Sequence, residues 1–301
     1  MSRRLITVGL FALLATLWGF SFLAIEVGLR SLEPVLFAAF RYALAAVLLL
    51  GYALARHEDW RPTGRPDIDA IVGGGVFLVA GNALLFVGQQ TVPSGVAAIM
   101  QSLVPVLTSL WALALLPEER VSVVGAAGIL LGFVGVGFIV QPDPSNLLGS
   151  DVVGRVLIFG QAASVALGGV IIQRAGPTLD RAALSGWSMA VGGVILFGVS
   201  AAVGEPFAFP ATPSGWAAVA YLGVFATAVA FLIYYTLLEV RGALETSLVA
   251  YLVPVVATIA GIVVLGESIT LPTVVGFLLV SVGFVLLKRR AIATLVSDAR
   301  R

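Results

Sequence analysis

Long apolar runs separated by short polar stretches are the main feature of this sequence. Ten such runs cover residues 5–25, 34–55, 68–88, 93–116, 122–140, 152–173, 181–203, 214–238, 242–265 and 271–287. A helix needs about 17 to 25 mainly apolar residues to cross a bilayer. The first run is longer than the core of a signal peptide, and no small-residue cleavage site follows it, so we expect it to be retained. The pattern predicts an all-α, polytopic membrane protein with ten transmembrane helices.

The composition agrees with a bilayer environment and excludes several kinds of chemistry. Apolar residues make up 59% of the chain and charged residues 11%, against about 25% charged residues in soluble domains, and the mean hydropathy is +1.07. The net charge of +1 gives no basic surface for nucleic acid, and cysteine is absent. The one histidine, His57, lies in a charged loop. We therefore expect a lipid bilayer around the protein, no cofactor, no metal and no nucleic-acid partner.

The second half of the chain repeats features of the first half. A shift of 149 positions places Pro105 on Pro254 and Glu118 on Glu267, and the segment Leu-Val-Pro-Val occurs at both prolines. A proline inside a membrane helix frees a backbone carbonyl, which is tolerated where the helix borders a watery cavity. Proline-interrupted helices at matching places in two halves are typical of a transporter's binding site. The alternative, that these prolines only set packing angles, stays open.

A stripe of glycines marks the last run of the first half. Its members are spaced by three and four residues and share one helix face: Gly125, Gly128, Gly132 and Gly135. A shift of 148 positions places Gly128 on Gly276 and Gly135 on Gly283 of the last run. Small residues at such spacing let two membrane helices approach closely, so we expect the stripe to be a packing surface.

The linker and the basic residues predict the topology. Residues 141–151 form the most turn-rich stretch, so we predict a first five-helix repeat over 1–140, this linker, a second repeat over 152–290 and a tail over 291–301. With both termini on one side, that side holds fourteen Lys and Arg residues and the other two, Arg30 and Arg155. The positive-inside rule places both termini in the cytoplasm of a multi-pass protein of the cell membrane. An odd number of helices per half inverts the second repeat.

Three features of the sequence resemble those of a known family. The segment Leu17-Trp18-Gly19-Phe20-Ser21-Phe22, Arg41 in the second run and the unit of Pro105 with Glu118-Glu119-Arg120 are similar to the EamA-type drug/metabolite transporter pattern. The resemblance covers essentially the whole chain, although Val165-Ala166 replace the Trp-Gly motif in the second half. It implies two inverted five-helix repeats around a central cavity walled mainly by helices 3, 4, 8 and 9, with helices 1 and 6 helping to gate it. It also implies export of small metabolites, with amino-acid exporters of the YddG type as the subgroup for comparison.

Polar residues inside the apolar runs either bind neighbouring helices or line a pathway. Helical spacing places several of them in stripes on the helices that the resemblance implies for the cavity. We predict that the substrate is bound by Trp18, Ser21, Asn82, Phe86, Gln89, Gln101, Tyr234 and Tyr251. Hydrogen bonds would come from Asn82, Gln89, Gln101 and Tyr251, and apolar walls from Trp18, Phe86 and Tyr234. For each residue, a role in helix packing stays open.

A second set of residues is predicted to be structural or to take part in gating: Arg41, Pro105, Pro254, Glu118 and Glu267. Arg41 needs a carboxylate, carbonyl groups or water inside the bilayer. A substrate carboxylate is one candidate, but Arg41 lies about 10 Å along its helix from Pro34 and can reach the interface, so we favour a structural role. Glu118 and Glu267 end their helices and lie too near the surfaces to indicate proton transport.

The sequence therefore predicts a secondary transporter that exports a small neutral or zwitterionic solute, most simply an amino acid, by alternating access. Export of other metabolites or drugs is the alternative within the family. Phosphorylated solutes are disfavoured because Arg41 is the single cation within a span. An integral-membrane enzyme is disfavoured because no nucleophile–base or metal constellation is present, and a channel because no charged pore lining is found. Substrate identity, energy coupling and oligomeric state stay open, and a monomer fits the pattern.

Overall fold

The computed structural model describes residues 3–56, 60–116, 122–140, 149–234, 236–237 and 249–299. Within these residues the chain is all-helical. Its long helices are α1 (Arg3–Gly28), α2 (Pro34–Arg56), α7 (Val123–Val140), α8 (Ser150–Ala175), α9 (Arg181–Ala202) and α13 (Leu271–Ala299). The shorter helices are α3 (Arg65–Gly73), α4 (Ala83–Gly88), α5 (Ser94–Met100), α6 (Val104–Leu115), α10 (Pro213–Ala220) and α12 (Val249–Ala260). The predicted helical class is confirmed.

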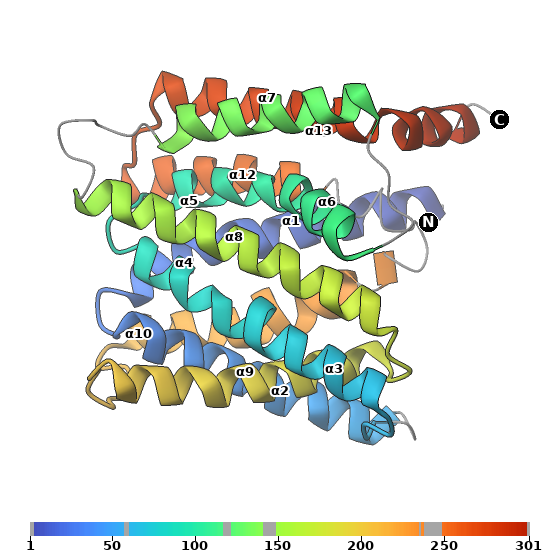
Figure 1. The fold of residues 1–301 in the computed structure, drawn as a ribbon. Coiled ribbons are helices and arrows are strands. Elements are labelled where there is room, and N and C mark those ends of the chain that lie inside the picture. Colours follow the sequence, from blue (N-terminus) through green and yellow to red (C-terminus); the bar gives the residue numbers. More distant parts are fainter. Residues whose placement is uncertain are drawn as a thin grey trace.

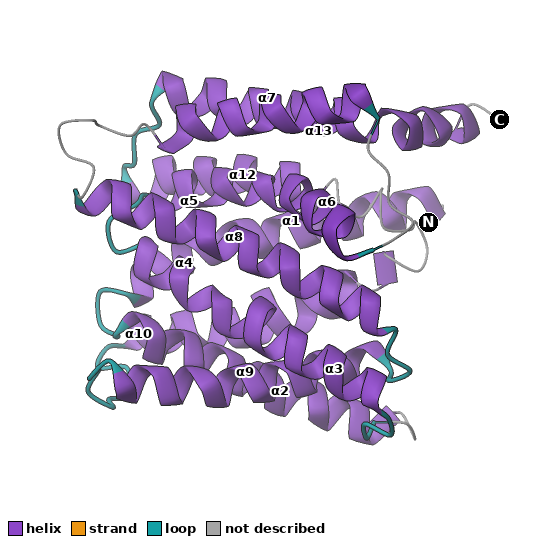
Figure 2. Cartoon of the chain, viewed as in Figure 1, coloured by secondary structure: helices purple, strands orange, loops and turns teal. Residues whose placement is uncertain are grey.

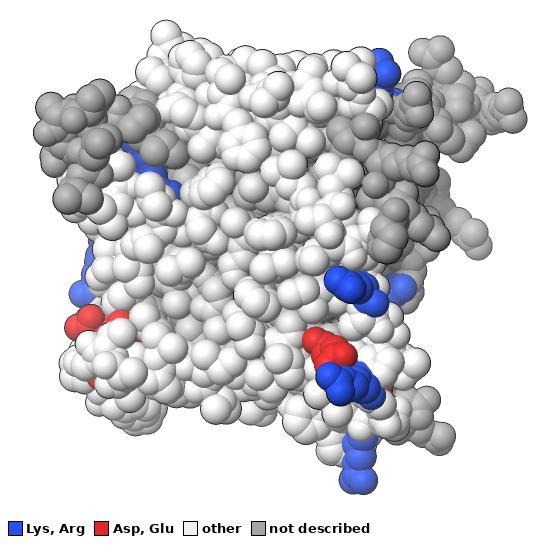
Figure 3. All heavy atoms as spheres, viewed as in Figure 1, with Lys and Arg blue, Asp and Glu red and all other residues white. Residues whose placement is uncertain are grey.

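The helices lie side by side in one bundle, with α1 beginning and α13 ending at the same end (Figures 1 and 2). Seven helical segments of the described chain are long and apolar enough to cross a membrane, and three shorter apolar helices cover Val123–Ile139, Val249–Leu265 and Leu271–Leu287. The charged side chains gather towards the two ends of the face seen in Figure 3, and its middle is uncharged. A polytopic membrane protein follows from this distribution.

Several spans are irregular inside the bilayer region. The third span contains a π-helical segment, η1 (Gly74–Val79), followed by a 3₁₀ turn, η2 (Ala80–Asn82), and the fourth contains the 3₁₀ turn η3 (Gln101–Leu103). The eighth and ninth contain the π-helical segments η4 (Tyr221–Val229) and η5 (Gly261–Leu265). Irregular turns within helices often mark functional sites. Here they lie at polar residues, among them Asn82 and Gln101.

The two prolines singled out in the sequence lie in different local settings. Pro105 is the second residue of α6, directly after the 3₁₀ turn, whereas Pro254 lies inside α12. Glu118 lies outside the described residues. The last helix continues to Ala299, past the end predicted at residue 287, so residues of the expected tail extend the helix.

Glycines bring α7 and α13 into close contact, as the stripe predicted. A Cβ atom added to Gly128 would collide with the carbonyl oxygen of Gly283, and one added to Gly135 would lie 2.7 Å from the carbonyl oxygen of Gly276. The two contacts pair residues that the sequence repeat relates to each other in crossed order. Elsewhere α2 packs on α9, α1 on α12 and α6 on α8.

Carboxylates from distant segments bind the first N–H groups of two helices. Glu205 accepts hydrogen bonds from the backbone N–H groups of Val35 (3.0 Å) and Leu36 (2.8 Å) at the start of α2. Glu267 accepts from Ser94 (2.8 Å) and Gly95 (3.0 Å) at the start of α5. The first N–H groups of a helix lack partners within it and favour a negative charge. Glu267 thus binds the start of α5 in this structure, and its predicted structural or gating role stays a prediction.

Asp67 binds backbone N–H groups of a turn at the opposite end of the bundle. Its side chain is 1% exposed and accepts hydrogen bonds from the backbone N–H groups of Thr178 (2.7 Å) and Leu179 (3.2 Å), just before α9. It also accepts from the N–H of Thr63 (3.1 Å). All three carboxylates bind backbone N–H groups that are more than 100 residues away in the chain.

The glycine contact can be tested on one helix with a matched control. Gly128→Ala should lower the free energy of unfolding by about 1–3 kcal/mol, because a methyl group overpacks the contact with α13. Gly137→Ala should be neutral or slightly stabilising, because no atom lies within 4 Å of an added Cβ there. Thermal unfolding of the purified protein in detergent compares the two. Equal unfolding temperatures for both variants would contradict the packing surface.

The capping role of Glu205 makes a second prediction. Glu205→Ala should cost about 1–3 kcal/mol of stability, since two backbone donors lose a charged acceptor. Glu33→Ala is the control, because Glu33 is an exposed carboxylate at the same end of α2. The measurement is again the unfolding temperature in detergent. The capping role is wrong if both substitutions shift it equally.

Candidate functional site

Three side-chain amides from separate spans form a hydrogen-bonded chain inside the bundle. Gln101 Nε2 donates to Gln161 Oε1 (2.8 Å), and Gln161 Nε2 donates to Asn82 Oδ1 (3.2 Å). Asn82 Nδ2 in turn donates to the carbonyl of Leu78 (2.7 Å). Gln161 is 2% exposed, so its amide is removed from solvent. We call Asn82, Gln101 and Gln161 the amide cluster.

The backbone at the amide cluster departs from regular helix geometry on two sides. Asn82 is the last residue of the 3₁₀ turn η2, and Gln101 is the first residue of the 3₁₀ turn η3. Pro105 has no N–H that could donate to the carbonyl of Gln101, four residues earlier. One backbone hydrogen bond of the helix is therefore missing at the cluster. The polar side chains therefore meet where two helices are interrupted.

Helix α8 holds the interrupted third span through further contacts. Ser164 Oγ donates to the carbonyl of Phe77 (2.7 Å), and a Cβ atom on Gly168 would lie 2.9 Å from the backbone nitrogen of Leu78. On the other side of α8, Trp111 Nε1 donates to the carbonyl of Ala163 (3.0 Å). Gln161 is thus fixed between two spans, one turn from Ser164. Gln161 was not among the predicted binding residues.

An aromatic group lies between α1 and the end of the eighth span. The ring of Trp18 is 5.7 Å from that of Tyr234 and 6.3 Å from that of Phe231. Ser21 Oγ donates to the carbonyl of Trp18 (2.6 Å), so this hydroxyl supports the helix. Two of the predicted wall residues, Trp18 and Tyr234, therefore lie close together. Phe231 was not predicted, because nothing in the sequence distinguishes it from the other phenylalanines of the apolar runs.

The other residues of the third-span stripe contact different helices. Phe86 is fully buried, with its ring 5.2 Å from that of Phe37 on α2. Gln89 is 2% exposed and donates to the carbonyl of Phe22 on α1 (3.1 Å), while its Oε1 has no partner. In this conformation both side chains pack between helices. Their predicted role in binding stays a prediction.

Tyr251 contacts α13 and has no hydrogen bond to the amide cluster. Its ring is 5.1 Å from that of Phe284 on α13, and its hydroxyl is buried without a hydrogen-bond partner. An unpaired buried hydroxyl costs about 1–3 kcal/mol. The hydroxyl is therefore a candidate donor for a hydrogen bond to a bound solute.

Arg41 is buried inside the bundle with 8% of its surface exposed. Its Nε donates to Thr227 Oγ1 in η4 (2.9 Å). The guanidinium carbon lies 5.0 Å from the ring centroid of Tyr42 and 6.0 Å from that of Phe86. Such distances allow cation–π attraction. The side chain is thus bonded to another helix in this structure, and its predicted structural or gating role stays a prediction.

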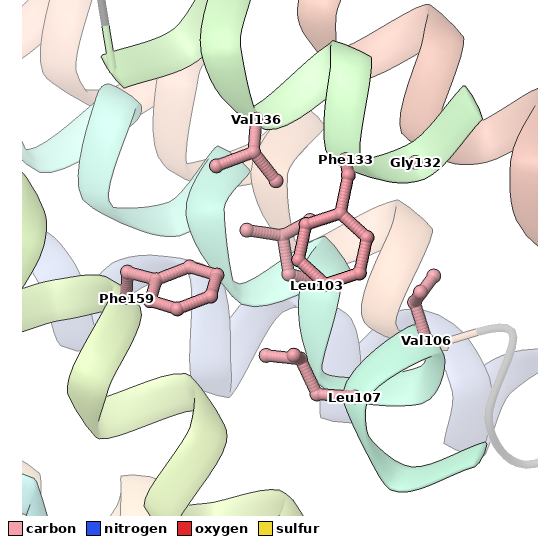
Figure 4. Close-up of a pocket in the computed structure, with 7 residues that line it drawn as sticks. All are labelled: Leu103, Val106, Leu107, Gly132, Phe133, Val136 and Phe159. Atoms are coloured by element: carbon pink, nitrogen blue, oxygen red, sulfur yellow. The ribbon is translucent and has the colours of Figure 1, made fainter. Parts of the chain in front are cut away.

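An apolar cleft lies between η3, α6, α7 and α8 (Figure 4). It has no room for a water-sized sphere. It is lined by Leu103, Val106, Leu107, Gly132, Phe133, Val136 and Phe159. None of these side chains can bond a polar group, so the cleft cannot orient a zwitterion.

An apolar bundle whose polar side chains meet where its helices break is the architecture of a membrane transporter. Comparison with known proteins gives the family. The sequence matches the EamA-like transporter family twice, over residues 5–141 and 152–289. The chain belongs to this family, as the sequence motifs indicated, and is a multi-pass membrane transporter.

Named relatives agree. Over 258 residues the chain is 32% identical to "Uncharacterized inner membrane transporter YedA" of Escherichia coli (strain K12), covering 84% of this chain and 81% of that protein. Over 292 residues it is 28% identical to an "Uncharacterized transporter" of Archaeoglobus fulgidus, covering 93% and 97%. A solved structure, "Crystal structure of protein", has a TM-score of 0.67 at 21% identity and covers 95% of this chain and 98% of that one, a likeness of fold alone.

The central position of Gln161 in the amide cluster can be tested. Gln161→Leu leaves Gln101 and Asn82 each without an amide partner and should lower the free energy of unfolding by about 1–3 kcal/mol. Gln90→Leu, at an exposed position, is the control. In the Gln161→Leu background a further Gln101→Leu change should cost less than it does alone, because the shared bond is already gone. Additive shifts in unfolding temperature would show that the two amides are not coupled.

Proposed function

We propose that this transporter exports small zwitterionic metabolites, foremost amino acids, through a site at the amide cluster. The observation that carries the proposal is the chain of hydrogen bonds that joins Gln101, Gln161 and Asn82 where the third and fourth spans are interrupted. Neutral amides donate and accept, so they can exchange partners with an ammonium or a carboxylate group at little cost. This suits a solute that has to be released again.

The aromatic group beside α1 supports an amino acid with an apolar side chain. Trp18, Phe231 and Tyr234 present three rings within 6.4 Å of one another. Rings of this kind supply large, rigid contact area. Small-molecule sites combine such walls with few polar groups. Export of other metabolites or of drugs by the same walls is the alternative that a substrate panel distinguishes.

For the mechanism we propose that ten helices form two inverted five-helix repeats that rock around this site. The positions of two π-helical segments support a duplication of the chain. The segments η1 and η4 begin at Gly74 and Tyr221, which are 147 positions apart. This separation is close to the shifts of 148 and 149 positions that relate the two halves of the sequence. The crossed contacts between the glycines of α7 and α13 support a two-fold relation between the halves. The pairing of α1 with α12 and of α6 with α8 fits the same relation.

The proposed orientation places both termini in the cytoplasm, on the side that holds fourteen of the seventeen Lys and Arg residues. The starts of α2 and α5, capped by Glu205 and Glu267, then lie on the outer side. Asp67 lies on the cytoplasmic side. Export carries the solute from the side of Asp67 to the side of the two glutamates.

The proposal is tested by counterflow in proteoliposomes with labelled amino acids and other metabolites, with and without a pH gradient. Gln101→Ala should reduce the flux of the transported solute about tenfold, the value of a lost hydrogen bond to a charged group, and should leave membrane insertion intact. Gln90→Ala is the matched control, because Gln90 is exposed. Unchanged flux in the Gln101→Ala protein removes Gln101 from the site, and absence of flux for every amino acid rejects the substrate class.

A further inference from the structure

We infer that Arg41 binds a carboxylate group of the solute, which makes a carboxylate a requirement for recognition. This inference deepens the proposed function and rests on it. Its starting point is the incomplete set of partners around the guanidinium. Of five N–H donors, Nε–H has a hydrogen-bond acceptor, Thr227 Oγ1 at 2.9 Å, and no carboxylate among the described residues forms an ion pair with Arg41.

The position of Arg41 makes an unpaired charge costly. It lies seven residues after the first residue of α2, about 10 Å along the helix, and 8% of its surface is exposed. Charged side chains at such depth are found paired with one another or with backbone carbonyls, or facing a functional pathway. The rings of Tyr42 and Phe86 offset part of the cost, but they accept no hydrogen bond in the plane of the guanidinium.

Arg155, near the start of α8, shows how the chain neutralises another arginine. Arg155 on α8 lies 2.9 Å from the carboxylate of Asp151 and donates to the carbonyl of Ile139 (2.8 Å). Arg41 has no such neighbour among the described residues. This difference is the ground on which we assign the partner of Arg41 to the solute.

The geometry favours a carboxylate as that partner. Thr227 occupies Nε and fixes the plane of the guanidinium, which leaves the edge formed by the two terminal nitrogens. This edge presents two parallel N–H donors, the arrangement that pairs with both oxygens of a carboxylate. A single cation balances a single carboxylate, whereas a phosphate carries more charge. Burial of the Arg41 side chain, which is 8% exposed, strengthens such a pair.

The ring of Phe86 connects this position to the amide cluster. Phe86 lies one helical turn after Asn82 on the same face of the third span, and its ring is 6.0 Å from the guanidinium carbon of Arg41. Phe86 is fully buried here, so the carboxylate reaches Arg41 in a conformation in which this ring moves aside. The solute then has its ammonium group towards the amides and its carboxylate towards Arg41.

The test compares matched pairs of probes on the purified full-length protein in nanodiscs. L-Phenylalanine and L-phenylalaninamide share a side chain and an amino group and differ in the carboxylate, and L-leucine and L-leucinamide form a second pair. Affinities come from intrinsic tryptophan fluorescence and from the shift in unfolding temperature. The variants are Arg41→Gln, Arg41→Lys and, as a control for the loss of an arginine that is paired within the chain, Arg155→Gln.

We expect the wild-type protein to bind each carboxylate probe at least tenfold more tightly than its amide. This preference should fall to about one in Arg41→Gln, be intermediate in Arg41→Lys, which keeps the charge but loses the fork, and persist in Arg155→Gln. A wild-type protein without the preference, or an Arg41→Gln protein that keeps it, overturns the assignment. The proposed function fails separately, when counterflow detects no amino-acid flux although the preference in binding is present.

Discussion

The absence of water in the hydrocarbon core is the constraint on which this structure depends. A polar group there must find its partner within the protein, since a lost hydrogen bond is not replaced by solvent. The chain meets the requirement at helix starts with carboxylates: Glu205 and Glu267 each bind two consecutive backbone N–H groups, and Asp67 binds the turn before α9. These bonds join segments far apart in sequence, so one chemical need also fixes how distant helices are placed.

The same constraint explains why the interrupted helices and the polar side chains coincide. A π-helical or 3₁₀ turn leaves backbone groups poorly paired, and the interior of a bundle is the place where neighbouring side chains can pair them. The third span is irregular from Gly74 to Asn82, and α8 binds it through Ser164 and Gln161. The irregular turns are therefore tolerated because polar side chains pair their backbone groups, and the polar side chains are tolerated because these turns offer them partners.

Much of the fold could be predicted from the sequence, because span length and glycine spacing are local properties. The apolar runs gave most of the described helix ends to within a few residues, although the last helix continues to Ala299. The stripe in α7 identified its close-packing face. The partner of that face, and the crossed order of its contacts with Gly276 and Gly283, depend on how helices cross, which no local pattern records.

The candidate site was less predictable for the same reason. Asn82, Gln101, Trp18 and Tyr234 could be chosen because polar and aromatic residues stand out within apolar runs. Glu205 and Thr227, in contrast, acquire their roles from partners about 170 and 186 residues away. Gln89 and Phe86 share a stripe with Asn82, yet each contacts a different helix. Spacing on one helix shows which residues share a face, and only the packing shows what that face meets.

Under the proposed function, the paired state of the amide cluster bears on how binding and movement are coupled. Gln161 is bonded on both sides, so a solute that bonds to Gln101 competes with a contact between two spans. A ligand shifts a conformational equilibrium only through a difference in its affinity for the two states. Exchange of an internal hydrogen bond for one to the solute provides such a difference, because the bond that is lost had held α8 against η3. Among the described residues the terminal nitrogens of Arg41 have no acceptor, so binding there needs no such exchange. Under the proposal, the carboxylate therefore supplies binding free energy and the amides convert part of it into helix movement.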